Sequence, residues 1–424
     1  MPVSSDNRHF DVIIIGGGPS GLAASVRLKQ LGVSRVLVVE RQPQLGGIPV
    51  HTAHFGFAIR HLKRLLTGPQ YARKLAKAAY DAGVTIATST TVFNLDPLAK
   101  EMTCVSARGH TTYRAEAILM ATGCRETTRS ALLLPGFRGR GIMSTSEAQQ
   151  YIHLMHTLPG KRIVVFGSED VGLSAVHTFG LTRAKVVGMV EEGPRMIGRK
   201  VFALGTLVPH RVPLYTRHTI KQILGSRRVE GVEIAAVDGQ GNLLPGTERT
   251  IACDTLIVSG KFLPENALAR SADIPLDSYT HGPVVDQQLQ SDIPGIFASG
   301  NLLRGVETAD VAALEGEWAA ASISRYLKDA ATFMGPRLKL TPEAPVKWVL
   351  PQRLLPGMPL PPPYLSTLRV SEQVSRSRII VGPEGKIWRS RKYLKLMPER
   401  RIRLNLHKWN MGANEDTIEI SLAR

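Results

Sequence analysis

The sequence predicts an α/β protein in which two Rossmann-like three-layer domains, one interrupting the other, are followed by a small β-rich appendage. Two stretches, at residues 11–24 and 161–173, read as an apolar run, a glycine turn and a small-residue helix, an order typical of dinucleotide-binding folds. After a proline-rich segment near Pro351, short alternating runs of polar and apolar residues favour strands. With 424 residues, the chain has room for about three structural units.

The first glycine turn carries the spacing G-x-G-x-x-G at Gly16, Gly18 and Gly21, with Pro19 and Ser20 between the last two. Gly16 permits the tight turn, Gly18 lets the backbone approach a pyrophosphate, and Gly21 allows close packing of helix on strand. The free N–H groups at the start of the helix then face the anionic ligand. With the strand before it and the helix after it, this turn predicts a dinucleotide site.

The next apolar run, Val36 to Val39, ends at Glu40 and Arg41. A carboxylate at the end of this second strand accepts hydrogen bonds from a ribose diol. We therefore assign Glu40 to the ribose and place Arg41 beside it as a further cofactor contact.

The second glycine turn has Gly167 and Gly172 at the framing positions but Glu169 where the middle glycine should stand. Glutamate brings bulk and negative charge to the point at which a pyrophosphate would approach a bare backbone. We expect the fold to be retained here without ordinary NAD(P) binding. The following strand ends at Glu191 and Glu192, which would repel a 2′-phosphate, so any residual preference should be for NAD over NADP.

Three more segments resemble the two-dinucleotide-domain flavoproteins, the pyridine nucleotide-disulfide oxidoreductase type. Members have a Gly-Gly loop after the ribose carboxylate, an Ala-Thr-Gly segment that closes the first half, and a late Gly-Asp element that meets the ribityl chain of the flavin. The corresponding residues here are Gly46, Gly47 and Ile48; Ala121, Thr122 and Gly123; and Gly300 and Asn301. The resemblance implies FAD at the first turn. Asn301 replaces the usual aspartate, keeping an acceptor but losing the charge.

The cysteines exclude several redox classes. Cys104, Cys124 and Cys253 are the three in the chain, and no two stand in a C-x-x-C spacing, which excludes a disulfide framework, a thiolate metal site and a nearby dithiol. Disulfide reductases of this fold need two cysteines close to the flavin. His51 and His54 occupy the region where one such pair would lie.

The stretch around these histidines carries a narrower resemblance, to the flavin subunit of bacterial multi-subunit amino-acid and amine dehydrogenases: the B subunit of hydrogen cyanide synthase, the A subunit of opine oxidase and the matching chain of D-hydroxyproline dehydrogenase. The shared pattern is Gly-Gly-Ile-Pro, two histidines, Gly-Phe, Thr-Gly-Pro at 67–69 and Tyr-Ala-Arg at 71–73. The resemblance covers about residues 8 to 330. It implies two partners, a ferredoxin-like [2Fe-2S] protein together with a catalytic flavoprotein subunit, hence a hetero-oligomer.

Two interpretations of His51 and His54 stay open. An imidazole titrates near neutrality, so either histidine can tune or protonate the flavin edge; equally, both can be buried, hydrogen-bonded loop residues. For Arg60, Lys63 and Arg64, the alternatives are a cationic helix face toward phosphates or a partner, and an ordinary solvated face.

These signals divide the chain. We expect the first and second parts of the FAD domain at 8–135 and 265–332, and the inserted NAD(P)-like domain at 136–264. A basic region, proline-rich and then β-rich, is expected at 336–424. From residue 335 onward there are 17 basic and 7 acidic residues, which suits an acidic partner, an anionic membrane surface or nucleic acid. No nucleic-acid motif accompanies the basic residues, so nucleic acid is the least favoured of the three.

Many relatives end in a cysteine-rich segment that binds a [2Fe-2S] cluster, but no cysteine follows Cys253, so this chain cannot build one. We expect Trp348, Trp388 and Trp409 to form the core of the appendage. The composition, 43% hydrophobic and 21% charged with mean hydropathy −0.03, is that of an ordinary globular protein. No window has the length of a membrane span, so we expect a cytoplasmic protein, with peripheral contact at the inner membrane face left open.

The hypothesis from sequence is an electron-relay FAD subunit that passes electrons from a separate dehydrogenase subunit to an iron–sulfur protein. One alternative is a stand-alone NAD(P)H-dependent flavin reductase, which requires Glu169 to tolerate the nicotinamide dinucleotide. Another is a scaffold with structural FAD and a basic docking domain.

Overall fold

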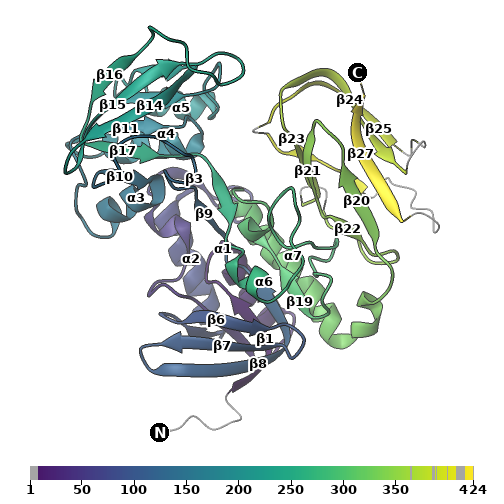
Figure 1. Cartoon of the computed structure of the whole chain (residues 1–424). Helices are drawn as coiled ribbons and strands as arrows, with labels where there is room; N and C mark the ends of the chain where they lie inside the picture. Colours follow the sequence, from purple (N-terminus) through teal and green to yellow (C-terminus); the bar gives the residue numbers. More distant parts are fainter. Residues whose placement is uncertain are drawn as a thin grey trace.

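The computed structural model describes residues 8–362, 365–383, 387, 389–398, 400–406 and 416–423. Two sheets of Rossmann type and a C-terminal pair of β sheets make up the molecule (Figure 1). This confirms the predicted fold class. In the part of the chain that the structure describes, no helix is long and apolar enough to cross a lipid bilayer.

The first sheet has the strand order β5-β2-β1-β8-β7-β6, and β19 also pairs with β8. Its strands are β1 (His9–Ile15), β2 (Val36–Val39), β5 (Thr85–Ala87), β6 (Thr91–Asp96), β7 (Glu101–Ser106), β8 (Gly109–Met120) and β19 (Ile296–Ala298). Helices α1 (Pro19–Gln30), α2 (Gly68–Asp81) and α7 (Ala309–Lys328) pack with it. A Cβ at Gly316 of α7 would come within 2.0 Å of the Ser20 carbonyl oxygen, so glycine lets α7 lie close against α1.

The second sheet is parallel throughout, with the order β10-β17-β11-β12-β13. Its strands are β10 (Ile142–Ser144), β11 (Arg162–Phe166), β12 (Lys185–Glu191), β13 (Leu214–Thr216) and β17 (Thr255–Val258), with helices α3 (Thr145–His153), α4 (Asp170–Gly180) and α5 (Lys200–Thr206). An antiparallel sheet of β14 (His218–Gly225), β15 (Val229–Ala236) and β16 (Arg249–Ala252) adjoins it. The chain passes from the first sheet to the second and back through the antiparallel pair β9 (Cys124–Glu126) and β18 (Phe262–Pro264).

The C-terminal sheets have the orders β22-β20-β27-β24-β25 and β21-β23-β26 and share one apolar core. Their strands are β20 (Leu338–Pro342), β21 (Val346–Leu350), β22 (Arg353–Leu354), β23 (Thr367–Val370), β24 (Val374–Gly382), β25 (Arg389–Leu396), β26 (Ile402–Arg403) and β27 (Thr417–Ala423). The expected place of Trp348 was wrong: Trp348 is buried with the core of the first sheet, whereas Val346 of the same strand belongs to the C-terminal core. The register of β21 shifts between these two residues, which turns Trp348 to the other side. Trp388 and Trp409 lie outside the described residues.

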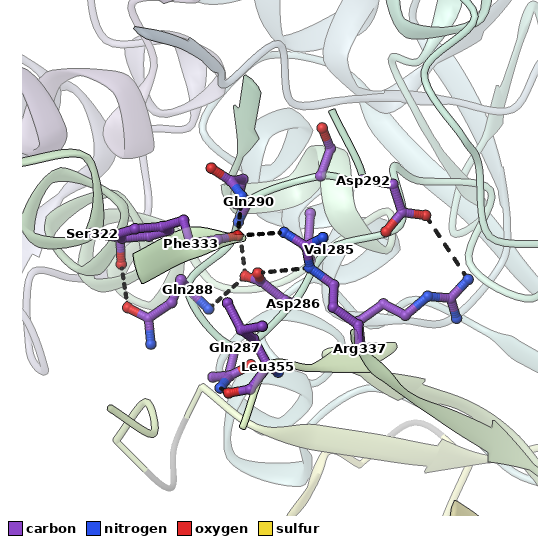
Figure 2. Close-up of polar contacts among 12 residues, drawn as sticks. Val285, Asp286, Gln287, Gln288, Gln290, Asp292, Ser322, Phe333, Arg337 and Leu355 are labelled. Atoms are coloured by element: carbon purple, nitrogen blue, oxygen red, sulfur yellow. Dashed lines mark hydrogen bonds and ion pairs between the residues drawn. The ribbon is translucent and has the colours of Figure 1, made fainter. Parts of the chain in front are cut away.

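A buried polar network fixes the C-terminal sheets to the first domain (Figure 2). Gln287 exchanges two hydrogen bonds with the backbone of Leu355, at 2.6 and 2.8 Å. Arg337 donates to the buried carboxylate of Asp286 at 3.3 Å. Since buried polar groups need partners, this network holds the C-terminal sheets in one place, and the appendage is a docked part of the molecule.

Of the two alternatives for Arg60, Lys63 and Arg64, the helix face is wrong, because the segment 58–64 forms turns and bends. Ala58 and Lys63 have φ values of 69° and 54°, a left-handed conformation that interrupts a helix. Arg60, Lys63 and Arg64 are exposed on these turns.

Candidate functional site: a cleft over the first glycine turn

A cleft of about 2220 Å³ runs between the two Rossmann-type sheets and the C-terminal sheets. It brings together most of the residues that the sequence singled out. Those lining it are Gly16, Gly18, Pro19, Ser20, Glu40, Arg41, Gly47, Ile48, His51, His54, Ala121, Thr122, Gly123, Glu169 and Asn301. Gly21, Gly46, Gly167, Gly172 and Gly300 are not part of the lining and serve the packing of the turns.

The glycines of the first turn have the separate roles that their spacing predicts. Gly16 has φ +114° and a Cβ there would lie 2.4 Å from the Ala121 carbonyl oxygen, while a Cβ at Gly21 would lie 2.0 Å from the Gly16 oxygen. At Gly18 the nearest atom to an added Cβ is 4.0 Å away. Close packing therefore demands glycine at positions 16 and 21, whereas Gly18 leaves open space over the start of α1.

Glu40 is buried at the end of β2 and its carboxylate is held by the backbone. Oε2 accepts a hydrogen bond from Gly17 N and Oε1 accepts one from Gln42 N, both at 2.7 Å. Each carboxylate oxygen has a second lone pair, so Glu40 can still accept from a ribose hydroxyl in the cleft. Arg41, next along the chain, is exposed on the same wall.

The Gly46-Gly47 loop closes against the first turn. Gly46 N donates to Gly17 O at 2.8 Å, and a Cβ at Gly47 would lie 3.0 Å from Gly18 Cα. Both glycines have positive φ, 121° and 62°, so the loop can turn tightly there. It leads into a 3₁₀ helix, Ile48–His51, whose first residue is exposed on the cleft.

The Ala-Thr-Gly segment follows β8 and lines the cleft. It is hydrogen-bonded to Glu265, in the segment that leads back from the second sheet. Thr122 Oγ1 donates to Glu265 O at 2.8 Å, and Glu265 N donates to Gly123 O at 2.9 Å. Ala121 N donates to Ile15 O at 2.8 Å, which aligns the segment with the end of β1.

Asn301 lines the cleft, but its side chain already has partners in the protein. Nδ2 lies 3.6 Å from Cys124 Sγ, and Oδ1 accepts from Glu307 N at 3.1 Å. Burial raises the pKa of the Cys124 thiol to about 12, so this cysteine is protonated at neutral pH. A Cβ at Gly300 would come within 2.8 Å of Ser20 Cβ, which explains the glycine before Asn301.

The second turn has the same backbone conformation as the first, but the side chain of Glu169 fills the space above it. Gly167 and Gly172 make the same contacts as Gly16 and Gly21: a Cβ at Gly172 would lie 2.4 Å from Gly167 O. Glu169 stands at the N-cap of α4 with φ −69° and ψ 172°, as Gly18 stands at the N-cap of α1 with φ −80° and ψ −174°. Its carboxylate lies over Gly260, where an added Cβ would be 2.0 Å from Oε2. The glutamate thus occupies the space that Gly18 leaves open in the first turn.

The loop after β12 also covers the second turn. Ser168 Oγ donates to Glu191 Oε2 at 2.5 Å and accepts from Ile197 N at 3.0 Å. Gly198 N donates to Ser168 O at 2.9 Å. Arg199 Nε lies 2.6 Å from Asp170 Oδ2. These contacts hold the segment 197–199 against the second turn.

The buried carboxylate of Glu169 predicts a dependence of stability on pH. Burial, together with the nearby Glu191 carboxylate, raises the pKa of Glu169 from 4.5 to about 7. A raised acid pKa gives stability that is complete below pH 4.5 and is lost as the pH rises through 7. Glu169→Gln should therefore match the parent near pH 5 and exceed its stability by up to about 3 kcal/mol at pH 8.

Thermal unfolding between about pH 5 and 8 measures this difference. Glu372→Gln, an exposed carboxylate between β23 and β24, is the matched control and should follow the parent at every pH. A constant offset between Glu169→Gln and the parent over this range would contradict a pKa near 7.

His51 and His54 lie at the junction of the two Rossmann-type sheets. Burial, and secondarily the His153 imidazole on α3, lowers the pKa of His51 to about 4. Burial also lowers the pKa of His54, whose ring packs 5.0 Å from the Phe202 ring and whose Nδ1 is 2.7 Å from Phe55 O. Both are therefore neutral at pH 7. His54 is a half-buried loop residue whose Nδ1 is within hydrogen-bond distance of a backbone carbonyl group. His51 is buried, and among the described residues its Nε2 has no hydrogen-bond partner.

The sequence interpretation missed the contribution of the C-terminal sheets to the cleft. Arg369, Arg400, Arg401 and Arg403 line it, and Arg401 Nη1 lies 3.1 Å from Glu307 Oε2, just before the start of α7. The only signal in the sequence is the positive charge of this region, which does not indicate the direction in which any one arginine points.

Comparison with known proteins agrees with this architecture. The chain matches the family described as pyridine nucleotide-disulphide oxidoreductase over residues 10–316. It is 25% identical to a thioredoxin reductase of Listeria innocua, covering 72% of this chain and 91% of that protein, and 24% identical to the A subunit of opine oxidase from Agrobacterium tumefaciens, covering 78% and 69%.

Solved structures share the fold. Thioredoxin reductase of T. acidophilum superposes with a TM-score of 0.62 at 21% identity, covering 75% of this chain and 98% of that one. L-proline dehydrogenase of P. horikoshii superposes with a TM-score of 0.54 at 18% identity, covering 76% and 56%. From the match over residues 10–316 and the two Rossmann-type sheets, the chain belongs to the pyridine nucleotide-disulphide oxidoreductase family, whose members bind FAD.

Proposed function

We propose that this chain is the FAD-binding electron-relay subunit of a multi-subunit dehydrogenase that oxidises an amino acid, an amine or a related substrate. The observation that carries the proposal is the contrast between two turns of the same backbone conformation. The first is open at Gly18, and the second is filled by Glu169. A chain with one open dinucleotide site can hold a flavin but lacks the usual route by which NAD(P)H reduces it.

The residues of the first turn suit FAD. The start of α1 presents free N–H groups to a pyrophosphate over Gly18, and Glu40 is held at the strand end where a ribose diol would lie. Bound FAD would supply two-electron acceptance with release of single electrons. The part played by the chain is to bind and orient the cofactor, and to keep the neighbouring imidazoles of His51 and His54 neutral.

The cysteines support transfer to another protein. Cys104 and Cys253 are buried, and Cys124 lies on the cleft with a raised pKa, so the chain has no dithiol to reduce and no ligand set for an iron–sulfur cluster. This supports transfer of the flavin electrons to a partner protein. The proposed partners are a ferredoxin-like iron–sulfur protein and a catalytic flavoprotein subunit. The distant similarity to the A subunit of opine oxidase, a protein named as one component of an enzyme, supports a hetero-oligomer.

Purification of the tagged chain from its native cells under mild conditions tests this function. The purified material should contain flavin and iron–sulfur absorption in one complex. Candidate amino acids and amines should reduce a dye through that complex, whereas the isolated chain should give no such activity. A chain that elutes alone, with no iron and no partner, would contradict the relay.

A further inference from the structure

A β-hairpin at residues 55–67 forms part of the edge of the cleft. Its strands are β3 (Phe55–Phe57) and β4 (Leu66–Thr67), which pair antiparallel. Phe55, Phe57 and Arg60 line the same cleft as Gly18 of the first glycine turn. A protein bound to this hairpin would therefore lie beside the cleft that is proposed to hold the flavin.

One side of the hairpin is fixed to the first domain. Ala58 is fully buried, and Leu62 and Leu66 pack against the core of the first sheet. His61 Nε2 lies 2.9 Å from Glu317 Oε1 on α7. The turns between β3 and β4 are thus held in place by buried contacts, although they contain neither helix nor sheet.

The other side of the hairpin exposes three large apolar side chains. Phe55 is 66% exposed, Ile59 is 51% exposed and Leu65 is 61% exposed. One exposed apolar residue is ordinary, but three on a short hairpin whose other side is buried are characteristic of a protein interaction site. With the exposed cations between them, they form what we call the hairpin surface, which consists of Phe55, Ile59, Arg60, Lys63, Arg64 and Leu65.

The charge of the hairpin surface is positive. Residues 41–80 contain seven lysines and arginines and no aspartate or glutamate. Two carboxylates of α7 contact the hairpin, those of Glu317 and the buried Asp310, and both do so at His61. Among the described residues, no carboxylate forms an ion pair with the three cations of the hairpin surface. These cations are therefore available to an acidic partner.

We propose that the hairpin surface is the docking site of an acidic, ferredoxin-like iron–sulfur protein that takes electrons from the flavin. This inference rests on the proposed relay function and assigns the electron acceptor to one place on the chain. Interfaces of electron-transfer proteins are small, and complementary charges steer the two proteins together. A second copy of this chain suits the surface less well, because two molecules of net charge +18 repel each other.

The iron-to-FAD ratio of the complex tests this site, after the tagged chain is purified from its native cells at low salt. Two double variants change the hairpin surface outside the cleft lining, Lys63→Gln with Arg64→Gln and Ile59→Ser with Leu65→Ser. Each should lower the ratio about tenfold or more by weakening the docking, with the FAD content unchanged. The ratio in the parent should also fall as salt is raised, because salt screens the attraction between exposed charges.

Two further double variants are the matched controls, Arg183→Gln with Arg227→Gln and Phe93→Ser with Leu98→Ser. All four residues are exposed and lie outside the cleft lining, so both controls should keep the ratio of the parent. If the parent contains iron and the hairpin variants match it, the docking site is wrong while the relay function stands. Equal losses in variants and controls would also overturn the site. A parent without iron contradicts the relay function itself, and the docking site with it.

A photo-reactive benzoylphenylalanine in place of Ile59 identifies what covers the hairpin surface. Illumination of the complex should cross-link this residue to the polypeptide that carries the cysteine ligands of the iron–sulfur cluster. The same photo-reactive residue in place of Leu98, which is 80% exposed and outside the cleft lining, should give no such product. A cross-link from position 59 to a second copy of this chain, to the catalytic flavoprotein subunit or to lipid would assign the surface to another occupant and overturn the proposal.

Discussion

Gly18→Glu is expected to abolish FAD binding while the chain remains folded. The substitution places on the first turn the residue that already fills the second, where Glu169 has nearly the same backbone conformation. A carboxylate about 4 Å from a pyrophosphate charge costs about 4 kcal/mol at an effective dielectric constant of roughly 20. This corresponds to a loss of affinity of about a thousandfold. Fluorescence titration of the deflavinated protein with FAD measures it.

Gly18→Ala distinguishes the effect of added negative charge on FAD affinity from the effect of added bulk. Gly18 has φ −80°, which any residue can adopt, and an added Cβ would have no neighbour closer than 4.0 Å. The alanine variant should therefore fold normally and lose far less affinity than the glutamate variant. Tight FAD binding by Gly18→Glu would contradict the assignment of the flavin pyrophosphate to this turn.

Arg304→Met is expected to lower the free energy of unfolding by about 3–5 kcal/mol, the usual effect of removing one partner of a buried ion pair. Arg304 and Glu315 are each 1% exposed, and their side chains are in direct contact. Loss of the guanidinium leaves the carboxylate of Glu315, a residue of α7, buried without its main partner. Urea denaturation of the parent and the variant gives the difference.

The double variant Arg304→Met with Glu315→Leu is the control for this effect. Replacing both charges by apolar side chains of similar size is often close to neutral, so the double variant should recover most of the lost stability. A loss in the double variant equal to or larger than that of Arg304→Met alone would contradict the ion pair as the cause. A single variant within about 1 kcal/mol of the parent would contradict it too.

The parts of the fold that the sequence predicts are those encoded locally. A strand, a glycine turn and a helix follow one another within a few residues, so the spacing alone assigns Gly16, Gly21 and Glu40 to their places. The Tyr-Ala-Arg pattern carries a resemblance, but the sequence predicts no structural role for it. In the structure Tyr71 is fully buried, with its hydroxyl 2.8 Å from His61 Nδ1. Its role in the structure is packing beneath the cleft.

The parts that the sequence does not predict depend on long-range packing. Nothing near Arg401 indicates that it meets Glu307 at the start of α7, since the contact follows from docking of the C-terminal sheets. Trp348 joins the core of the first sheet for the same reason. Glu169 stands out in the sequence because it breaks a pattern, but the cover provided by Ile197 and Gly198 is visible only in three dimensions.

An anaerobic titration of the FAD-loaded chain with NADH, followed by the flavin absorption, tests the central claim most directly. Because Glu169 fills the second turn, the flavin should stay oxidised when a stoichiometric amount of NADH is added and should bleach when dithionite follows. Rapid, stoichiometric bleaching by NADH would contradict the account, since the second turn would then accept the nucleotide and the chain would be a reductase in its own right.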